Sequence, residues 1–445
     1  MRKFILWTLL ALAFSGCASV DSQQWYKGNT HTHTLWSDGD DFPEMAADWY
    51  KRHGYHFLVL SDHNIMSQGE KFKNVSKHVK KNDIVAKHES RWGTGVLEKE
   101  IDGEKIRVKL KTLEQVRSMV AEPGRFIMIE GLEITSSLRG KENPKQVLPV
   151  HSNPVNVDEL LMPEPRASVD ELLDHHAELI SGYMARADHP VFWHINHPNF
   201  KYAITAEQVA RVLAAQGLEI FNASGGCNNQ GNEEFPSAER IWDIVNTIRL
   251  KEYGVPPLFG CATDDTHRYH TPENQYHSGE VLHDAPGLAW VMVRAASLTP
   301  DTITQAMRRG DFYASTGVAL KDLQYDAKAG VLSLEIDSRP GVTYTIRFIG
   351  SPKDISLDHK TPDPVVDGKG GSHPVSGTYS DVRLGAVLKE VHGTKAAYQL
   401  TGDELYVRAV VSCDDENMAI IGEGAIQKQA WTQPVGWEKQ IEESR

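Results

Sequence analysis

The stretch FLVLSDHN, residues 57–64, joins four apolar residues directly to four polar ones. A short apolar run bounded by polar residues is typical of a buried β-strand. Five other stretches have the same texture: RFIMIE (125–130), VFWHIN (191–196), LEIFNA (218–223), LFGCAT (258–263) and LAWVMV (288–293). We therefore interpret residues 57–61 and these five stretches as buried strands.

Amphipathic segments lie between several of these strands. The spacing of their apolar positions predicts helices over residues 43–53, 168–186, 205–215, 236–252 and 300–309, with Pro43 in the first turn of the first helix. Alternating strands and helices are typical of parallel strands joined by crossover helices. We expect an α/β fold over residues 25–317, with ligands at the carboxyl ends of its strands.

The pattern changes after residue 318. The stretches GVLSLEID (330–337), VTYTIRFIG (342–350) and LYVRAVVSC (405–413) alternate apolar and polar residues. Alternation with a period of two is typical of strands that bury one face, and no convincing helical pattern separates these stretches. We expect residues 318–445 to form a small antiparallel β-sandwich.

The N-terminus carries the pattern of an export signal. An apolar run over residues 4–14 follows Arg2 and Lys3. Since a bilayer-spanning helix needs about 20 apolar residues, this run is too short to span a membrane and fits a cleavable signal.

The end of that run, FSGC (14–17), resembles the lipobox of bacterial lipoproteins. The resemblance implies that residues 1–16 are removed, that Cys17 receives lipid, and that residues 17–24 form a linker. The protein would then be exported and lipid-anchored to the bacterial cell envelope, facing the periplasm or the cell surface. The alternative is an ordinary signal peptide with cleavage nearby.

The charge of the chain argues against a nucleic-acid partner, and its distribution is uneven because one segment is basic. The net charge is −13, which argues against nucleic acid, because such binding relies on many contacts from Lys and Arg to phosphates. We interpret residues 64–124 as an insertion, within which residues 71–111 hold twelve Lys or Arg and six Asp or Glu. This basic segment is interpreted as a solvated face. The alternative is a lid or membrane-facing patch that attracts anions and holds part of a substrate.

The cysteines limit the chemistry. Apart from Cys17 they are Cys227, Cys261 and Cys413, so one bridge at most can form. A bridge between Cys227 and Cys261 is one interpretation, and three inert buried thiols are the other. Because no cysteine has the spacing of a metal site, any metal must be held by nitrogen and oxygen ligands.

Histidines and carboxylates gather at the ends of the expected strands. In NTHTHTLWSDG (29–39), His31 and His33 would share one face of an extended strand, about 6–7 Å apart. The other strand ends supply Asp62 with His63, Glu130 with Glu133, His151, His194 with His197, and Asp264 and Asp265 with His267. Because buried imidazoles and carboxylates are costly without partners, a shared metal cluster would satisfy many of them at once.

Local geometry favours one residue in each ambiguous pair. Asp265 and His267 share a strand face, whereas Asp264 has the other parity. Pro198 favours an extended conformation at His197. His194 is then interpreted as a residue behind the ligands, facing the substrate or packed in the core, and Glu130 and Asp62 as supporting residues. The other thirteen histidines, for example His78, His175, His176 and His359, are interpreted as surface residues.

The ordered series HxH, SDG, DH, GxE, H, HP and DxH resembles the PHP family, named for polymerase and histidinol phosphatase domains, over residues 25–270. The resemblance implies a distorted β/α barrel that binds two or three divalent ions and hydrolyses phosphoesters. The implied metal ligands are His31, His33, Asp38, His63, Glu133, His151, His197, Asp265 and His267. GDFYAST (310–316) and AWTQPVGW (430–437) also resemble an exported subgroup with a C-terminal β domain.

The resemblance leads to a mechanism and two alternatives. Glu133 would bridge two ions of zinc, manganese or iron, and Asp38, His63 and His267 would hold a third. A bridging hydroxide would attack the phosphorus of a small anionic substrate, with His194 or His267 as the acid for the leaving group. The first alternative is a carbamate, amide or ester hydrolase with the same metals. The second is a non-catalytic envelope-binding lipoprotein.

Overall fold

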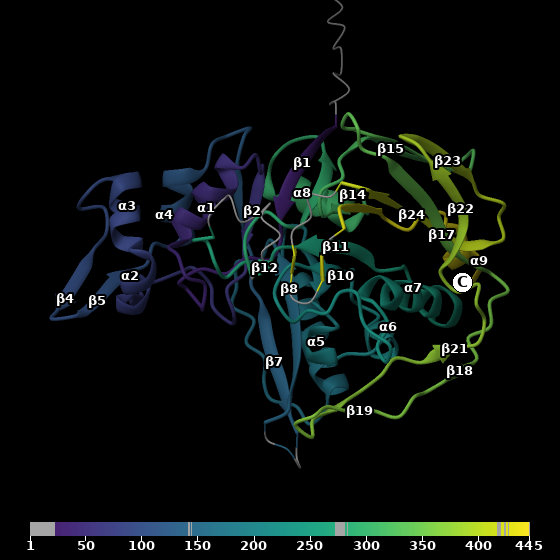
Figure 1. Cartoon of the computed structure of the whole chain (residues 1–445), viewed down its shortest axis with the longest axis horizontal. Coiled ribbons are helices and arrows are strands. Elements are labelled where there is room, and N and C mark those ends of the chain that lie inside the picture. The colour runs from purple at the N-terminus through teal and green to yellow at the C-terminus, as the bar shows by residue number, and fades with distance from the viewer. Residues whose placement is uncertain are drawn as a thin grey trace, which may run out of the picture.

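The computed structural model describes residues 23–140, 143, 145–271, 281–282, 284–415, 420–421, 424–425 and 427–444. The expected signal segment 1–16 and Cys17 lie outside this range. Figure 1 shows the insertion at the left, the C-terminal strands at the right, and helices α5 to α7 between them and below. Within the described chain, no helix is both long and apolar enough to cross a bilayer.

One extended sheet runs through most of the described chain. Its nine strands lie in the order β22-β17-β24-β27-β14-β13-β1-β2-β6 within the described residues. Strands β1 (Gln24–Asn29), β2 (Phe57–Leu60) and β6 (Ile127–Glu130) pair in parallel, as expected. By contrast, β13 (Trp290–Ala295) and β14 (Phe312–Ser315) are antiparallel, because β13 returns alongside β1.

A second sheet has five strands in the described residues, in the order β11-β10-β9-β8-β7. Strands β9 (Phe192–Ile195), β10 (Gly217–Asn222) and β11 (Phe259–Thr263) are parallel. The hairpin of β7 (Ile134–Arg139) and β8 (Val147–Val155) adds two antiparallel pairings.

The two sheets are in contact, but their described strands do not form one continuous hydrogen-bonded sheet. Isolated bridges join Thr32 to Thr266 on one side and Gly131 to Val155 on the other. Among the described residues the expected barrel is therefore not a continuous hydrogen-bonded cylinder. The fold is a mixed α/β structure in which the ends of β1, β2, β6, β10 and β11 still come together.

An apolar core fills the space between the sheets. Phe57, Val59, Ile129, Phe192 and Phe259 belong to one buried cluster, together with residues of β13 and β14. Helix α8 (Pro300–Arg308) covers part of this cluster with Ile303 and Met307. The polar strand ends lie beyond this core.

The predicted helices are present with shifted ends. Helices α1 (Pro43–Arg52), α5 (Val169–Met184), α7 (Ala238–Ile248) and α8 fall within the predicted ranges. Helix α6 (Ala206–Ala210) ends earlier than predicted. The reason is the buried Arg249, whose guanidinium donates to the carbonyls of Ala210, Val212, Leu213 and Ala215, so these groups need no helical partners.

The insertion forms a small body of its own beside α1. It contains β3 (Phe72–Asn74), α2 (Ser76–Asn82), α3 (Ile84–Trp92), β4 (Lys99–Asp102), β5 (Lys105–Lys109) and α4 (Leu113–Val120). Strands β3, β5 and β4 form a three-stranded sheet within the described chain. The apolar side chains of Val75, Ile84, Val108 and Leu110 pack against Trp36.

The C-terminal strands form two layers around a third core. Strands β15 (Leu320–Asp326), β16 (Val331–Ile336) and β23 (Lys395–Gln399) face β17 (Tyr344–Pro352), β22 (Ala386–His392) and β24 (Glu404–Cys413). The second layer is not separate, because β27 (Gln429–Thr432) pairs with both β24 and β14. The expected sandwich is therefore only partly independent. The three cysteines of the described chain are buried free thiols, so the interpretation of a Cys227–Cys261 bridge is wrong.

Candidate metal centre

The polar residues at the strand ends converge on one buried cluster. Nine side chains contribute to it: His31, His33, Asp38, His63, Glu133, His151, His197, Asp265 and His267. These are the nine residues that the resemblance implied as ligands. Of these side chains, only Asp38 is largely exposed, at 58%, because it lies at the mouth.

The deepest group consists of His31, His33 and Asp265. The two imidazole Nε2 atoms lie 3.1 Å apart, so the residues share one face as the HTH spacing predicts. Asp265 Oδ1 lies 3.2 Å from His31 Nε2 and 3.0 Å from His33 Nε2. Three potential ligand atoms therefore point at one small volume.

Glu133 lies at the centre of the cluster. Its Oε1 lies 3.2 Å from His31 Nε2, and 2.9 Å from His151 Nδ1. Its Oε2 contacts His63 Nδ1 and lies 3.5 Å from His33 Nε2. Each oxygen thus faces a different set of imidazoles, which is the arrangement that a bridging carboxylate needs.

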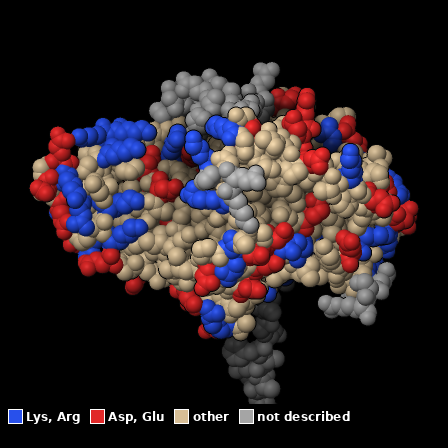
Figure 2. All heavy atoms as spheres, turned by 90° about the horizontal axis from the view of Figure 1, so that it is seen from below, with Lys and Arg blue, Asp and Glu red and all other residues tan. Residues whose placement is uncertain are grey.

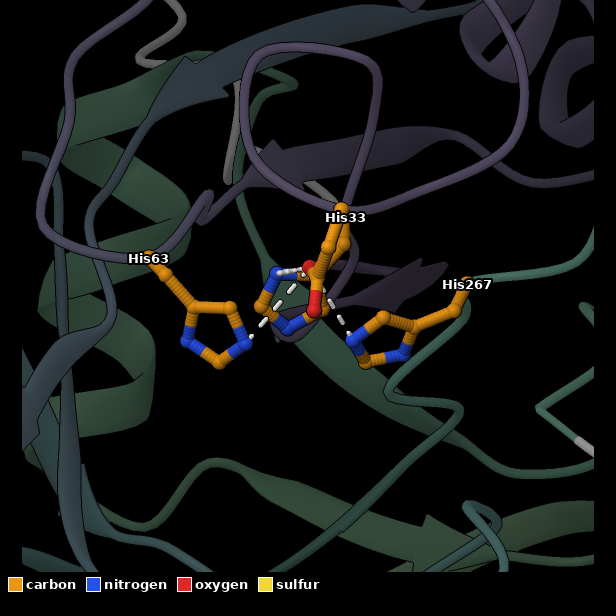
Figure 3. A group of neighbouring side chains, drawn as sticks. His33, His63 and His267 are labelled. Atoms are coloured by element: carbon orange, nitrogen blue, oxygen red, sulfur yellow. Dashed lines mark ion pairs between the residues drawn. The ribbon is translucent and has the colours of Figure 1, made fainter. Parts of the chain in front are cut away.

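The outer group surrounds Asp38. Its Oδ1 lies 3.4 Å from His267 Nε2, 3.6 Å from His63 Nε2 and 3.9 Å from His33 Nδ1. Figure 3 shows the rings of His33, His63 and His267 converging on the space between them. These four residues are the third position that the sequence suggested, with His33 added.

Two ligand residues have left-handed backbones. His197 has φ of 21° and Asp265 has φ of 49°. The expectation that Pro198 keeps His197 extended is therefore wrong. Asp265 and His267 both reach the cluster, but Asp265 lies beyond β11 in this conformation, so strand parity is not the reason. Non-glycine residues in this region are uncommon and mark positions that the surrounding structure holds.

Glu219 orients two of the histidines, and the sequence analysis did not single it out. Its Oε1 lies 2.7 Å from His31 Nδ1, and its Oε2 accepts a hydrogen bond of 2.9 Å from the backbone N–H of His197. If His31 Nδ1 donates to Glu219, then His31 Nε2 presents a lone pair to the cluster. A register shift in β10 between Glu219 and Phe221 turns both Glu219 and Asn222 towards the site. The available signal was one acidic residue inside an apolar strand.

Amides complete the support of the carboxylates. Asn222 Nδ2 donates to Asp265 Oδ2 over 3.1 Å, and Asn196 Nδ2 donates to Glu133 Oε1 over 2.9 Å. These bonds fix one oxygen of each carboxylate. The other oxygen of Asp265 is left facing His31 and His33.

The three acidic residues at the strand ends that were not assigned as ligands, Asp62, Asp264 and Glu130, hold other parts of the structure. Asp62 accepts from the backbone N–H groups of Thr34 and Ser37 and so shapes the loop before Asp38. Asp264 accepts from Tyr50 and from the backbone of residues 287–289. Glu130 accepts from Gln68, away from the cluster.

The remaining histidines include one that lies behind the ligands, as the sequence suggested, and others whose burial differs from the interpretation. His194 is fully buried behind His31, with Nε2 3.2 Å from Thr30 Oγ1, and is not among the described residues that line the cavity. His175 and His176 are buried at 7% and 0% exposure, because α5 turns them towards β8 and the preceding loop. His78 lines the cavity. The interpretation of His175 and His176 as surface residues is therefore wrong, whereas His78 is half-buried and His359 is exposed.

The electrostatics of the cluster favour ionised carboxylates. Burial alone would raise the pKa of Glu133 and of Asp265, but the surrounding histidines hold both well below their usual values. Burial, together with His267 and His63, lowers the pKa of His33 to about 3. At neutral pH the site therefore presents ionised carboxylates and a neutral His33. The surrounding carboxylates raise the pKa of His31, His63 and His267, so these three imidazoles would release protons when a metal ion binds.

The donor set fits divalent ions. Asp265 Oδ1 is buried and makes no hydrogen bond with good geometry among the described residues, although two imidazole nitrogens lie within 3.2 Å. A buried carboxylate oxygen that faces two imidazole nitrogens without a hydrogen bond lies where a metal ligand would lie. Imidazole and carboxylate ligands suit zinc, manganese and iron.

The cluster forms the floor of a cavity of about 460 Å³. Its walls include Phe200, Ser224, Gly225 and Cys227, and its mouth carries cationic side chains from Lys77, Lys81 and Arg268. Arg268 is partly balanced by Asp284, with Nε and Oδ2 3.5 Å apart. The cavity is therefore wide enough for a small ligand and has cationic side chains as well as the histidines and carboxylates of the cluster among its lining residues.

No family model and no curated protein matches the chain. Among solved structures, a two-domain protein from Bacteroides vulgatus ATCC 8482 containing a predicted PHP-like metal-dependent phosphoesterase is similar. It has 11% identity and a TM-score of 0.37, covering 93% of this chain and 96% of that one. A putative metal-dependent phosphoesterase from Bifidobacterium adolescentis ATCC 15703 has 12% identity and a TM-score of 0.30, covering 55% and 89%.

A third similar structure is an amidohydrolase from Chromobacterium violaceum with bound sulfate and no metal. It has 12% identity and a TM-score of 0.28, covering 54% of this chain and 87% of that one.

Proposed function

We propose that the chain is a metal-dependent hydrolase and that its substrates are small phosphoesters. The observation that carries the proposal is the convergence of nine histidine and carboxylate side chains on one cavity floor, with the buried Asp265 Oδ1 unsatisfied by any described hydrogen-bond donor. Such a cluster is costly to bury unless ions neutralise it. The non-catalytic alternative would not require this complete set.

Two ions would be held around Glu133 by His31, His33, His151, His197 and Asp265, and a third by Asp38, His63 and His267. Divalent ions at such sites ionise bound water near neutral pH and neutralise charge on substrate oxygens. The protein itself contributes the placement. Glu219 orients His31, and Asn196 and Asn222 fix the carboxylates of Glu133 and Asp265.

The cavity walls support an anionic substrate. Lys81 and Arg268 line the mouth, where they would attract and orient a phosphoryl group above the cluster. A neutral carbamate or ester would gain less from these cations. Of the two candidate acids for the leaving group, His267 lines the cavity and His194 does not, so His267 would act as the acid when the third metal position is empty.

The test is a metal assay followed by a substrate panel. Purified protein should contain at least two divalent ions per chain by elemental analysis. It should release p-nitrophenol from p-nitrophenyl phosphate faster than from bis-p-nitrophenyl phosphate, and faster than it hydrolyses naphthyl carbamates. Faster turnover of the carbamates would assign the site to attack at carbon, and fewer than two ions would contradict the ligand assignment.

Glu133→Gln provides the matched variant. The amide keeps the volume of the side chain but cannot bridge two cations, so kcat should fall by on the order of 10³-fold. Circular dichroism should show an intact fold. Unchanged turnover in this variant, at normal metal content, would remove Glu133 from the proposed mechanism.

We also propose that the mature protein is anchored to the envelope through lipid on Cys17. The support is the FSGC pattern in the sequence. The variant Cys17→Ser should move from the membrane fraction to the soluble fraction and should not incorporate radiolabelled palmitate. Retention of Cys17→Ser in the membrane fraction would contradict the anchor.

A further inference from the structure

A second hollow lies beside the metal cavity, on the insertion. It has a volume of about 680 Å³ and is lined by Asn74, Ser76, Lys77, Lys80, Lys81, Glu104 and Lys105. We call it the outer hollow. Lys77 and Lys81 line both the outer hollow and the metal cavity, so the two spaces adjoin through these side chains. Figure 2 shows Lys and Arg side chains crowded over this end of the molecule.

Some cations of the insertion are paired with carboxylates. Lys99 pairs with Glu89, Lys109 with Glu70, and Arg107 with Glu100. Within the hollow, Lys80 pairs with Glu104 at 2.7 Å, which neutralises the one carboxylate that lines it. Five of the twelve Lys and Arg side chains of residues 71–111 are therefore paired with a carboxylate, with Arg91 and Asp48 as the fifth pair.

Three lysines of the outer hollow have no such balance. In the described part of the chain, no carboxylate oxygen lies within 4.0 Å of the ammonium of Lys77, Lys81 or Lys105. Lys77 and Lys81 are four residues apart on α2, and therefore lie on one side of the helix. Like charges gathered around one hollow repel one another, and an anion bound between them would remove that repulsion.

The outer hollow is held at a fixed position relative to the cluster. Asn82 Nδ2, at the end of α2, donates to Asp40 Oδ2 over 3.5 Å. Lys73 Nζ donates to the carbonyl of Ser37, and Lys71 Nζ to that of Trp36. These contacts tie the insertion to the loop that carries Asp38. A substrate with its phosphoryl group over the cluster would therefore meet the three lysines at one defined side.

We infer that the outer hollow is a second anion subsite, and that the preferred substrates are phosphoesters whose alcohol part carries a further negative group. This inference rests on the proposed function. The phosphoryl group would lie over the metal cluster, and the second group, a carboxylate or another phosphate, would lie among Lys77, Lys81 and Lys105. Ammonium groups bind such anions as point charges, so either kind of group is accepted.

A matched pair of substrates tests the subsite. Glucose 6-phosphate and 6-phosphogluconate have the same phosphoester, and the second adds one carboxylate at the far end. We expect kcat/KM to be about tenfold higher for 6-phosphogluconate, mainly through a lower KM. Lys105→Ala should reduce this preference by about fivefold. The control is Lys99→Ala, which removes a paired lysine of the same insertion and should keep the preference.

Binding without turnover separates the inference from the proposed function. Calorimetry on metal-loaded Glu133→Gln should show tighter binding of 6-phosphogluconate than of glucose 6-phosphate, and Lys105→Ala in that background should remove the difference. If no phosphoester is hydrolysed but this binding preference is present, the proposed function fails and the subsite stands. Equal binding of the two compounds, or equal effects of Lys105→Ala and Lys99→Ala, would overturn the subsite.

Discussion

The protein contains two buried clusters of charged side chains that differ in how they are satisfied. Where α7 meets β24, Arg408 is fully buried and donates to both oxygens of Asp243, at 2.8 Å and 2.7 Å. Tyr406 donates to the same carboxylate over 2.8 Å. In the cluster at the strand ends, by contrast, Asp265 Oδ1 faces two imidazoles without a hydrogen bond.

The difference separates structural charge from charge that requires a ligand. Arg408 Nε and Nη2 donate to the two oxygens of Asp243, so that carboxylate is satisfied without an ion, although Arg408 Nη1 makes no described hydrogen bond. The strand-end cluster places carboxylate oxygens and imidazole nitrogens around a common point, and Asp265 Oδ1 is left without a described hydrogen bond there. Burial and charge alone would not distinguish the two clusters, whereas the hydrogen bonding of their carboxylate oxygens does.

Breaking the Arg408–Asp243 pair should have the largest effect on stability. Arg408→Met leaves the Asp243 carboxylate buried without a counter-ion, so the free energy of unfolding should fall by about 3–5 kcal/mol. Urea unfolding followed by tryptophan fluorescence measures this change. The double variant Arg408→Met with Asp243→Leu should recover part of the loss, because no charge is then unpaired. A loss below about 1 kcal/mol for the single variant would show that the pair is not a structural anchor.

Removing metal should lower stability through the strand-end cluster and not through the Arg408–Asp243 pair. When the free metal concentration is 100 times Kd, one bound ion stabilises the native chain by about 2.7 kcal/mol. A chelator should therefore lower the melting temperature of the wild type in differential scanning calorimetry, and excess zinc or manganese should restore it. The Arg408→Met variant should show the same chelator-dependent shift. An equal melting temperature with and without the chelator would contradict a bound ion.

The smallest effect should come from a residue that does not line the cavity. Glu219→Gln weakens the acceptor for His31 Nδ1, so metal affinity should fall about 10- to 100-fold. Competition with a chromophoric chelator measures the affinity. Glu130→Gln is the matched control, since Glu130 contacts Gln68 rather than a ligand. Equal affinities in the two variants would show that Glu219 does not orient His31.

The cluster was predictable from the sequence because its residues follow strands whose ends meet. Strand β2 pairs in parallel with β1, and β6 pairs in parallel with β2. The residues that follow these strands, His63 and Glu133, therefore lie next to His33. The predicted strands and the longer helices were correct for the same reason, since apolar periodicity reports which face is buried. These features depend on short segments and their order.

The features that were missed depend on contacts between distant segments. Glu219 contacts His31 because the register of β10 shifts after Glu219, and the apolar periodicity of the sequence does not predict such a shift. The burial of His176 depends on Ser136 and Ser152, both of which approach α5 from the β7–β8 hairpin. The joining of the two sheets by single bridges depends on how far each sheet curves, which the sequence of one strand does not specify.

The pairing of β27 with β14 has a consequence for how this chain can be cut or recombined. A protein truncated near Gly317 would lack β27. Strand β14 would then be an edge strand with unpaired backbone groups, to which strands of other chains could bind. The truncation would also remove Gln433, whose amide holds both backbone groups of Gly260 in β11. The C-terminal third therefore completes both sheets of the α/β part rather than forming a separable domain, and exchanging it with that of a similar protein would require both of these contacts to be kept.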